Sequence, residues 1–515
     1  MTQRDQRLVV RVILVATALR LLVALVLPLG IDESYAAVIS RTVSLSYFDH
    51  PPAVFWLAHA AAALGGESPL ALRWPFVLLF AGACWMLFLL SARLFSFRAG
   101  LWAVVVAQLI PVFSLSSGGW VLPDGPLLFG STAAGLALAT AIPVARELSP
   151  GDRQAAVASW WIWAMLGLSL GVAGLSKYHA ALLGAGMAVF VITDRVARRW
   201  LARPQPYVAV LIALLCVVPV FAWNAQHDWI SFRFQGGRAA GPGNPLTALL
   251  QNIGGQAGYL LPWFWIPLIV LLYRGLRTGP RDRATWFCCC LGAGPVLVFT
   301  LAALGGRAGL PHWPAPGFFL LLPMLGAAIA GWERRAPRAA HRAMAAAAAV
   351  FAFLLTIVVT HAATGWVAVI VPSLHRRDPA FELLEYRSLR DSLQGAGLLR
   401  SVRYVATTDW LRGSKIGYAL GASKPMLVLN HDMRHFRFAV DVSALHGTDG
   451  LLLTRVTDGM TTDSVQRAAL RYASRFDSLQ FVRTIPVLRG ADTALTLGVF
   501  SARRLRVGQK TDTTP

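Results

Sequence analysis

Long apolar runs separated by short polar segments recur along this chain from Leu8 to about Pro372. Many of these runs are long enough to cross the hydrocarbon core of a bilayer, which takes about 20 helical residues. The first run is long, lacks a small-residue cleavage site and is followed by further spans, so we interpret it as a helix and not as a signal peptide. The pattern predicts membrane helices over residues 8–29, 70–92, 99–116, 125–145, 159–176, 179–194, 206–223, 247–272, 285–304, 314–331 and 343–371.

The pattern changes after about residue 372, where the chain becomes less apolar and helical periods alternate with short strand signals. A capping Asp378 before Pro379 and a terminal glycine predict a helix over 378–397, and a second amphipathic helix is expected over 461–476. Strands are expected over 402–408, 425–430, 450–456 and 495–503. The expected fold class is a polytopic α-helical membrane protein with about 11 or more transmembrane helices (residues 1–372) and a small C-terminal α/β domain (373–515) that ends in a disordered tail.

The composition supports a membrane protein, with 56% hydrophobic and 14% charged residues and a mean hydropathy of +0.56. The net charge of +22 would suit a nucleic-acid partner, but its distribution favours another origin. With the N-terminus taken as cytoplasmic, most arginines fall in the cytoplasmic segments, as the positive-inside rule requires. We therefore expect no nucleic-acid partner, and the odd number of spans predicts an extracytoplasmic C-terminal domain. The few basic residues of the exterior segments are Arg41, Lys177, Arg233, Arg238 and Arg307.

The five cysteines all lie in predicted spans: Cys84, Cys216, Cys288, Cys289 and Cys290. None has metal-ligand spacing with histidines, and the C-terminal region has no cysteine with which they could pair. We interpret them as small apolar packing residues.

The first exterior loop, residues 30 to 69, is the longest between spans and carries charges close to apolar sequence. Asp32 and Glu33 follow the first span, and Asp49 and His50 precede a double proline that prevents one continuous helix. We predict that the loop folds back over the membrane surface and brings Asp49 and His50 towards Asp32 and Asp124. Tyr35 and the other aromatic residues of the loop are expected at headgroup depth.

Further exterior positions could also carry chemistry, and each has a plainer alternative. Asp124 opens the fourth predicted span and could simply cap that helix. Lys177 could contact phosphate or extend along the lipid surface towards water, and His312 could bind substrate or belong to an aromatic belt. Arg233, Arg238 and Arg307 are well suited to phosphate.

One face of the predicted membrane domain thus gathers acids, bases and aromatic residues around apolar spans. This pattern favours an enzyme whose substrate has an apolar tail, a phosphate and a polar head. Transporters more often place ionisable residues within the spans, where this sequence has almost none. A lipid-linked sugar flippase and a membrane-anchored binding protein remain alternatives, and the second predicts that the first-loop acids are dispensable.

The chain resembles the polyprenyl-phosphate-dependent glycosyltransferases of the GT-C superfamily. The stretches that carry the resemblance are IDESYAAVISRTVSLSYFDHPPAVFWL, LPDGPLLF, GLSKYHAALL, PVFAWNAQHDWISFRFQGG and PHWPAPGFFLLLP. They are similar to glycosyltransferase family 39, the dolichyl-phosphate-mannose–protein mannosyltransferase-like proteins, and to the lipid A aminoarabinose transferases. The resemblance implies a bacterial cytoplasmic-membrane enzyme with an extracytoplasmic active site. It would move a sugar from a polyprenyl-phosphate donor to a glycolipid such as lipid A, a cell-wall glycan or a protein.

The same resemblance implies roles for individual residues. The first-loop acidic motif falls on Asp32, the expected catalytic carboxylate, and on Glu33, which would support it, and the second exterior acid falls on Asp124. His50 stands where aminoarabinose transferases have a lysine, so other cations are expected to share the phosphate charge. The expected donor- and substrate-binding residues are Asp49, His50, Lys177, Tyr35, Arg233, Arg307 and His312. No cofactor is certain, and a divalent metal, if there is one, is expected at Asp32 and Glu33.

Overall fold

The structure is a computed structural model, and it describes residues 3–144, 159–238, 241–371, 373, 378–456, 469–490 and 492–507. The chain forms two compact units. The first consists of Met1–Leu25, Ser44–Leu57 and Arg73–Phe353, and the second of Val26–Val43, Ala58–Leu72 and Leu354–Pro515. The predicted domain boundary at residue 372 stays a prediction.

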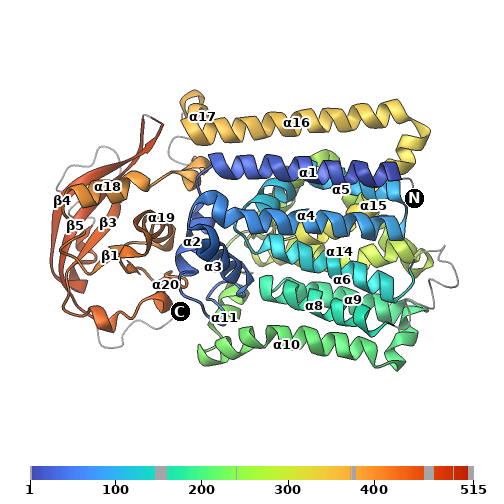
Figure 1. The fold of residues 1–515 in the computed structure, drawn as a ribbon, viewed down its shortest axis with the longest axis horizontal. Coiled ribbons are helices and arrows are strands. Elements are labelled where there is room, and N and C mark those ends of the chain that lie inside the picture. Colours follow the sequence, from blue (N-terminus) through green and yellow to red (C-terminus); the bar gives the residue numbers. More distant parts are fainter. Residues whose placement is uncertain are drawn as a thin grey trace. The chain divides into compact units, whose positions relative to one another are not determined.

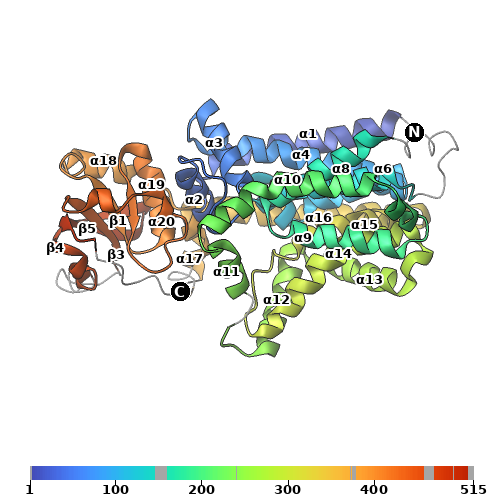
Figure 2. The ribbon, with the colours of Figure 1, turned by 90° about the horizontal axis from the view of Figure 1, so that it is seen from below.

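The first unit is a bundle of apolar helices, most of which run along one common direction (Figures 1 and 2). Helices α1, α3, α4 and α16 contribute residues to both units. In chain order the helices are α1 (Gln3–Val26), α3 (Ala53–Gly65), α4 (Pro69–Leu94), α5 (Phe97–Leu109), α6 (Asp124–Ala141), α8 (Trp160–Ser176), α9 (Ala180–Thr193), α10 (Gln205–Gln226), α11 (Ile230–Gly237), α12 (Pro245–Leu260), α13 (Pro262–Thr278), α14 (Arg283–Leu301), α15 (Ala315–Arg335) and α16 (Pro337–Thr364). A π-helical turn, Val112–Ser117, follows α5, and short 3-10 turns occur at Ala197–Ala202, Gly279–Arg281 and Ala302–Gly305.

Helices occupy all the predicted membrane spans. Among the described residues, six helices are long and apolar enough to cross a bilayer: α1, α4, α10, α14 with the turn that follows it, α15 and α16. A seventh candidate is the pair α12–α13, which covers the predicted span 247–272 but bends by 113°. Leu261 sits at the bend with a φ of 68°, and Pro262 begins the second helix. The predicted total of about eleven spans stays a prediction.

Two arginines inside the predicted spans escaped the sequence analysis. Arg20 of α1 donates from Nε to the carbonyl oxygen of Ser114 (2.7 Å) and from Nη2 to Gln108 Oε1 (2.5 Å). Arg73 of α4 is 1% exposed. Because a charged side chain in an apolar surrounding needs compensating partners, the carbonyl at the π-helical turn gives Arg20 a structural reason to lie there.

The second unit contains a five-stranded mixed sheet with the order β2-β1-β3-β5-β4. Its strands are β1 (Tyr404–Thr407), β2 (Met426–Val428), β3 (Gly450–Val456), β4 (Phe476–Arg489) and β5 (Asp492–Leu505). β1 pairs in parallel with β2 and β3, whereas β5 pairs antiparallel with β3 and β4. All four residues of β1 are buried, as expected for a central parallel strand with both faces covered.

The helices of this unit are α2 (Ile31–Ile39), α17 (Trp366–Ile370), α18 (Arg387–Gly395), α19 (Trp410–Leu420) and α20 (Phe436–Ala439), of which α18, α19 and α20 contact the sheet. Three short 3-10 turns lie at Pro379–Leu383, Gly421–Ser423 and Ser443–Leu445, and a fourth lies at Ala473–Arg475. Helix α19 contacts β1, β2 and α2, so it links the sheet to the segment that contains Asp32. The sheet core includes Tyr404, Leu452 and Phe500, all with no exposed surface.

The four predicted strands coincide with β1, β2, β3 and β5, but the sequence analysis missed β4. β4 is an edge strand that contains Pro486 and several charged residues, and such an edge lacks the apolar run of a central strand. The predicted helix over 378–397 divides into a 3-10 turn and α18, while Asp378 caps its start by accepting from the Ala380 amide as expected. The helix predicted over 461–476 and the C-terminal tail fall largely outside the described residues.

Candidate functional site

A buried ion pair lies at the start of α6. Lys177, which follows α8, donates from Nζ to both carboxylate oxygens of Asp124 at 2.9 and 3.1 Å. Both side chains are largely buried, with 6% and 8% of their surface exposed. This burial argues against a lysine that extends along the lipid surface. Asp124 is the first residue of α6, and the N-cap position before it is Pro123.

Three histidines interact with this ion pair through their charges. Lys177 and Asp124 both have coulombic interactions with His50, His179 and His312. We call Asp49, His50, Asp124, Lys177 and His312 the polar cluster. It unites five predicted site residues from four separate segments of the chain.

Burial keeps His50 neutral at physiological pH. It lowers the His50 pKa to about 4, because Asp49 and Asp124 only partly offset desolvation and the repulsion from Lys177 and Arg238. Burial and Lys177 lower the pKa of His312 to about 4 in the same way. His50 Nδ1 is buried and has no hydrogen-bond partner among the described residues. His50 can therefore exchange a hydrogen bond with a substrate, but at neutral pH it does not supply the positive charge of a lysine.

Backbone contacts hold the loop that carries Asp49 and His50. The hydroxyl of Ser231 donates to the carbonyl oxygen of Tyr47 (3.0 Å), and Gln235 Nε2 donates to that of Asp49 (2.5 Å). Phe48 packs against Phe234, with ring centroids 4.8 Å apart. Helix α11 thus anchors the FDHPP segment.

The exterior arginines differ in their surroundings. Arg238 lies 4.8 Å above the Trp313 ring and is among the charges that lower the pKa of His50 and His312. Arg233 and Arg307 are exposed, and Arg307 donates to the carbonyl oxygen of Gly237 at 3.4 Å. The structure therefore favours Arg238, which was an exterior arginine but not one of the predicted site residues, over the other two as a neighbour of the polar cluster.

His179, interpreted as a packing residue, stacks on Phe299 with ring centroids 4.3 Å apart. The cysteines also act as packing residues, since all five are free thiols and Cys288, Cys289 and Cys290 are buried.

The first-loop acids belong to the second unit, at the start of α2. Asp32 is exposed, whereas Glu33 is 1% exposed and accepts from the Gly30 amide at 2.8 Å. Glu33 therefore acts as a helix-capping residue, which is a form of structural support next to Asp32. Tyr35 is also buried, and its hydroxyl accepts from the His435 amide at 3.0 Å. Its ring packs edge-on against Trp410, so Tyr35 contributes to packing within the second unit, and its place at headgroup depth stays a prediction.

Helix α19 holds the ends of the α2 segment. Lys415 of α19 is 5% exposed and donates to the carbonyl oxygen of Leu29. At the other end of α2, Arg41 donates to the carbonyl oxygens of Gly417 and Gly421, both at 3.0 Å, and forms an ion pair with Glu67. Sequence analysis gave no sign of these contacts, which join residues more than 350 positions apart.

The divalent metal site considered at Asp32 and Glu33 stays a prediction. Glu33 is buried and bonded to the backbone while Asp32 is exposed, so the two carboxylates occupy different surroundings. Among the described residues, no group of three or more His, Cys, Asp or Glu side chains could hold a metal ion.

Comparisons with known proteins agree with the predicted resemblance. A family model described as dolichyl-phosphate-mannose-protein mannosyltransferase matches residues 49–223, which include all of the polar cluster except His312. The lipid A galacturonosyltransferase RgtD of Rhizobium johnstonii is 25% identical over 283 residues, or 54% of this chain and 56% of that protein. The match thus spans little more than half the length of that relative.

The fold is similar to that of ArnT from Cupriavidus metallidurans. The crystal structure of ArnT bound to undecaprenyl phosphate aligns with a TM-score of 0.61 at 16% identity, over 95% of this chain and 97% of ArnT. The apo form gives the same TM-score at 17% identity. The predicted resemblance is therefore confirmed: the chain is a mostly helical membrane protein with the GT-C fold, similar in sequence to the dolichyl-phosphate-mannose–protein mannosyltransferases and in fold to ArnT.

Proposed function

We propose that the protein is a membrane glycosyltransferase that moves a sugar from a polyprenyl-phosphate donor to an extracytoplasmic acceptor, with a glycolipid such as lipid A as the favoured acceptor. The observation that carries the proposal is the buried Lys177–Asp124 pair with His50 beside it. The ArnT structure with undecaprenyl phosphate supports the donor class, and the match to a lipid A galacturonosyltransferase supports the acceptor class.

The leaving group explains the need for a fixed cation. When the bond between the anomeric carbon and the phosphate oxygen breaks, polyprenyl phosphate departs with the electron pair and gains negative charge. A positive group fixed in advance stabilises this charge in the transition state. Lys177 is such a group, because two hydrogen bonds to the Asp124 carboxylate hold its Nζ in one position. Neutral His50 would donate a hydrogen bond to a phosphate oxygen.

Asp32 is the proposed general base. The acceptor hydroxyl oxygen forms the new bond to the anomeric carbon, and its proton passes to the Asp32 carboxylate. The exposure of Asp32 leaves its carboxylate accessible to a substrate, while Glu33 secures the helix start next to it. Asp124 serves the donor phosphate indirectly, through Lys177.

The test uses purified protein in lipid nanodiscs. Labelled polyprenyl-phosphate hexoses, hexuronic acids and pentoses are supplied one at a time, and free polyprenyl phosphate is measured with and without lipid A. We expect release from one donor, accelerated by lipid A and absent in Asp32→Asn. Asp391→Asn, which removes an exposed carboxylate from α18, is the matched control and should behave as wild type.

Two outcomes would count against the proposal. Wild-type turnover in Asp32→Asn would remove that residue from the catalytic role. If no donor released polyprenyl phosphate, even with crude membrane extract as a source of acceptors, the transferase assignment would fail, and a flippase or a membrane-anchored binding protein would become the better interpretation.

A further inference from the structure

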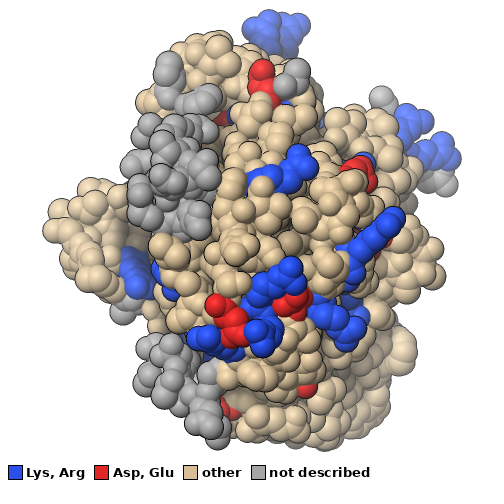
Figure 3. All heavy atoms as spheres, turned by 90° about the vertical axis from the view of Figure 1, so that its left-hand side faces the viewer, with Lys and Arg blue, Asp and Glu red and all other residues tan. Residues whose placement is uncertain are grey.

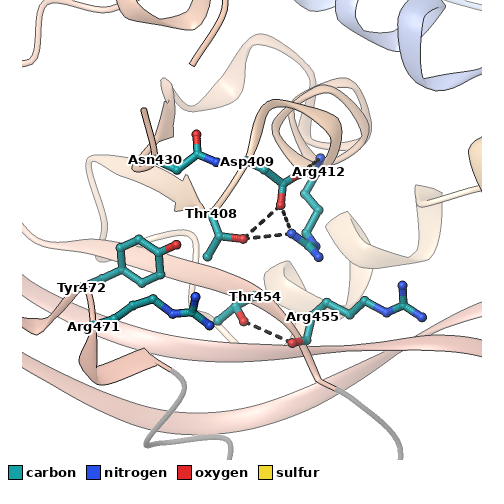
Figure 4. A pocket seen from close by; sticks show the side chains of 8 residues that line it. All are labelled: Thr408, Asp409, Arg412, Asn430, Thr454, Arg455, Arg471 and Tyr472. Carbon is teal, nitrogen blue, oxygen red and sulfur yellow. Dashed lines mark hydrogen bonds and ion pairs between the residues drawn. The ribbon is translucent and has the colours of Figure 1, made fainter. Parts of the chain in front are cut away.

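A polar cavity of about 280 Å³ lies at the carboxyl ends of the parallel strands in the second unit (Figure 4). It is separate from the polar cluster, and the proposed function does not use it. The lining residues come from the segments that follow β1 and β2, from β3 and from the segment before β4. They are Thr408, Asp409, Arg412, Asn430, Thr454, Arg455, Arg471 and Tyr472.

The sheet topology explains why a cavity forms there. From β1 the chain passes through α19 to β2 on one side, while β3 pairs with β1 on its other side. In open α/β sheets, connections that leave towards opposite sides open a crevice at the carboxyl ends of the strands, where ligands bind. Thr408 and Asp409 follow β1 directly and therefore lie at this switch point.

The charges of the lining are unequal, with three arginines and one carboxylate. Asp409 caps α19 by accepting from the Arg412 amide at 2.9 Å, and its carboxylate pairs with Arg412 Nη1. The same Nη1 donates to Thr408 Oγ1 at 2.9 Å. A guanidinium has five N–H donors, so these contacts leave further donors of Arg412 for a ligand.

The remaining arginines face different ways. In Figure 4 the guanidinium of Arg471 extends towards Thr454 and the hydroxyl of Tyr472 points towards Thr408, whereas the side chain of Arg455 points away. The Arg455 guanidinium lies 5.8 Å from the Phe381 ring. Burial lowers the pKa of Arg412, and Arg455 and Arg471 lower it further, although Tyr386 and Tyr472 oppose them. An anion between Arg412 and Arg471 would offset this repulsion.

A second hollow on the same unit provides a contrast. It is lined by Arg403, Arg503, Arg504, Asp449 and Asp477, together with small polar residues. There Arg503 pairs with Asp449 and Arg504 with Asp477, so two lining carboxylates balance two of the three arginines. The excess of positive charge is therefore larger in the first cavity.

We propose that the cavity at the carboxyl ends of β1, β2 and β3 binds a phosphorylated sugar. Arg412 and Arg471 would hold the phosphate, since guanidinium groups match its geometry. The hydroxyls of Thr408, Thr454 and Tyr472 would bind sugar hydroxyls. Asn430 Oδ1, which is buried without a partner among the described residues, would accept from another sugar hydroxyl. The ligand could be a soluble sugar phosphate or the phosphorylated headgroup of a glycolipid.

The test is calorimetric titration of the full chain in nanodiscs with N-acetylglucosamine 1-phosphate, N-acetylglucosamine and inorganic phosphate. We expect the sugar phosphate to bind more tightly than either part alone. Arg471→Gln should weaken its binding by about tenfold or more, because a hydrogen bond to a charged group is lost. Arg471 is exposed, so this variant should fold normally. Arg503→Gln, which removes an arginine of the second hollow, is the matched control.

A second set of titrations identifies the source of the ligand. If nanodiscs that contain phosphorylated lipid A no longer bind the soluble ligand, and nanodiscs with dephosphorylated lipid A still do, the site takes a glycolipid headgroup. If neither lipid competes, the site takes a soluble sugar phosphate, and the proposal holds in that form. Equal affinities for the sugar phosphate in wild type and Arg471→Gln would overturn it, as would equal losses in Arg471→Gln and Arg503→Gln.

Discussion

Two ion pairs, one from each unit, lie in opposite surroundings. In the helical unit, Lys177 and Asp124 pair with 6% and 8% of their side-chain surface exposed. In the unit that contains the sheet, Arg503 and Asp449 pair with 64% and 30% exposed. Figure 3 shows such Lys and Arg side chains beside Asp and Glu side chains on one face of the molecule. Removing one partner of a buried pair leaves an uncompensated charge in a poor solvent, whereas water compensates the exposed pair.

Burial, and not the unit itself, accounts for this contrast. Asp378 belongs to the second unit, but its side chain has no exposed surface. It accepts from Arg489 at 2.7 Å and from His361 at 2.9 Å. An isolated buried carboxylate would be costly, and these two partners compensate its charge. Each unit therefore confines its buried charges to sites where partners surround them.

The largest expected effect comes from breaking the buried pair. Asp124→Asn should lower the free energy of unfolding by about 3–5 kcal/mol, because Lys177 remains buried without a counter-charge. Equilibrium unfolding in mixed detergent micelles measures the loss. The double variant Asp124→Asn/Lys177→Met should recover much of the stability but none of the transfer activity. If Asp124→Asn changes stability by less than about 1 kcal/mol, the pair behaves like a surface pair.

The next effect concerns acid stability. The His50 pKa of about 4 lies below its ordinary value of 6.5. His50 therefore binds a proton more weakly in the folded state than in the unfolded state. The contribution of His50 to stability is therefore fully present above about pH 6.5 and is lost as the pH falls to about 4. At most it amounts to about 3 kcal/mol. Unfolding measured between pH 7 and pH 4 should show a shallower decline in His50→Gln. If stability declined with pH equally steeply in wild type and His50→Gln, the lowered pKa of His50 would be contradicted.

An intermediate effect is expected at Lys415, which tests whether α19 positions Asp32. Lys415→Met should cost about 1.5–3 kcal/mol, because the bond to the Leu29 carbonyl is lost. We expect kcat to fall with little change in KM for the donor, and Lys415→Arg should restore part of kcat. A variant that loses stability but keeps its kcat would show that Lys415 has a structural role alone.

The smallest effect is expected at the exposed pair. Arg503→Gln removes one partner of Asp449, and the free energy of unfolding should change by less than about 1 kcal/mol. The residual difference should shrink further in high salt, because exposed charges are screened. A loss comparable with that of Asp124→Asn would remove the distinction between the two kinds of pair.

Much of this architecture follows from local patterns in the sequence. Apolar runs longer than about 18 residues have few stable solutions other than membrane helices, and each predicted run coincides with one or two helices. The short apolar runs that became β1, β2 and β3 show the buried pattern of central strands. Edge strand β4 lacks that pattern, because one side of an edge has no neighbouring strand and charged residues are tolerated there.

The sequence by itself determined which residue types are available near the expected membrane surface: the acids of the first loop, Asp124, Lys177 and the histidines. Only the tertiary structure decided their state. It paired Lys177 with Asp124 across 53 positions, placed Glu33 where its carboxylate accepts a hydrogen bond from a backbone amide, and buried Tyr35. It also partly buried His50 and its Nδ1 atom, which lowers the pKa of this histidine to about 4. The physical reason is that the charge and hydrogen bonding of a side chain depend on its exposure to water and on its partners. Folding sets both, because the residues that bury or pair with a side chain come from distant parts of the chain.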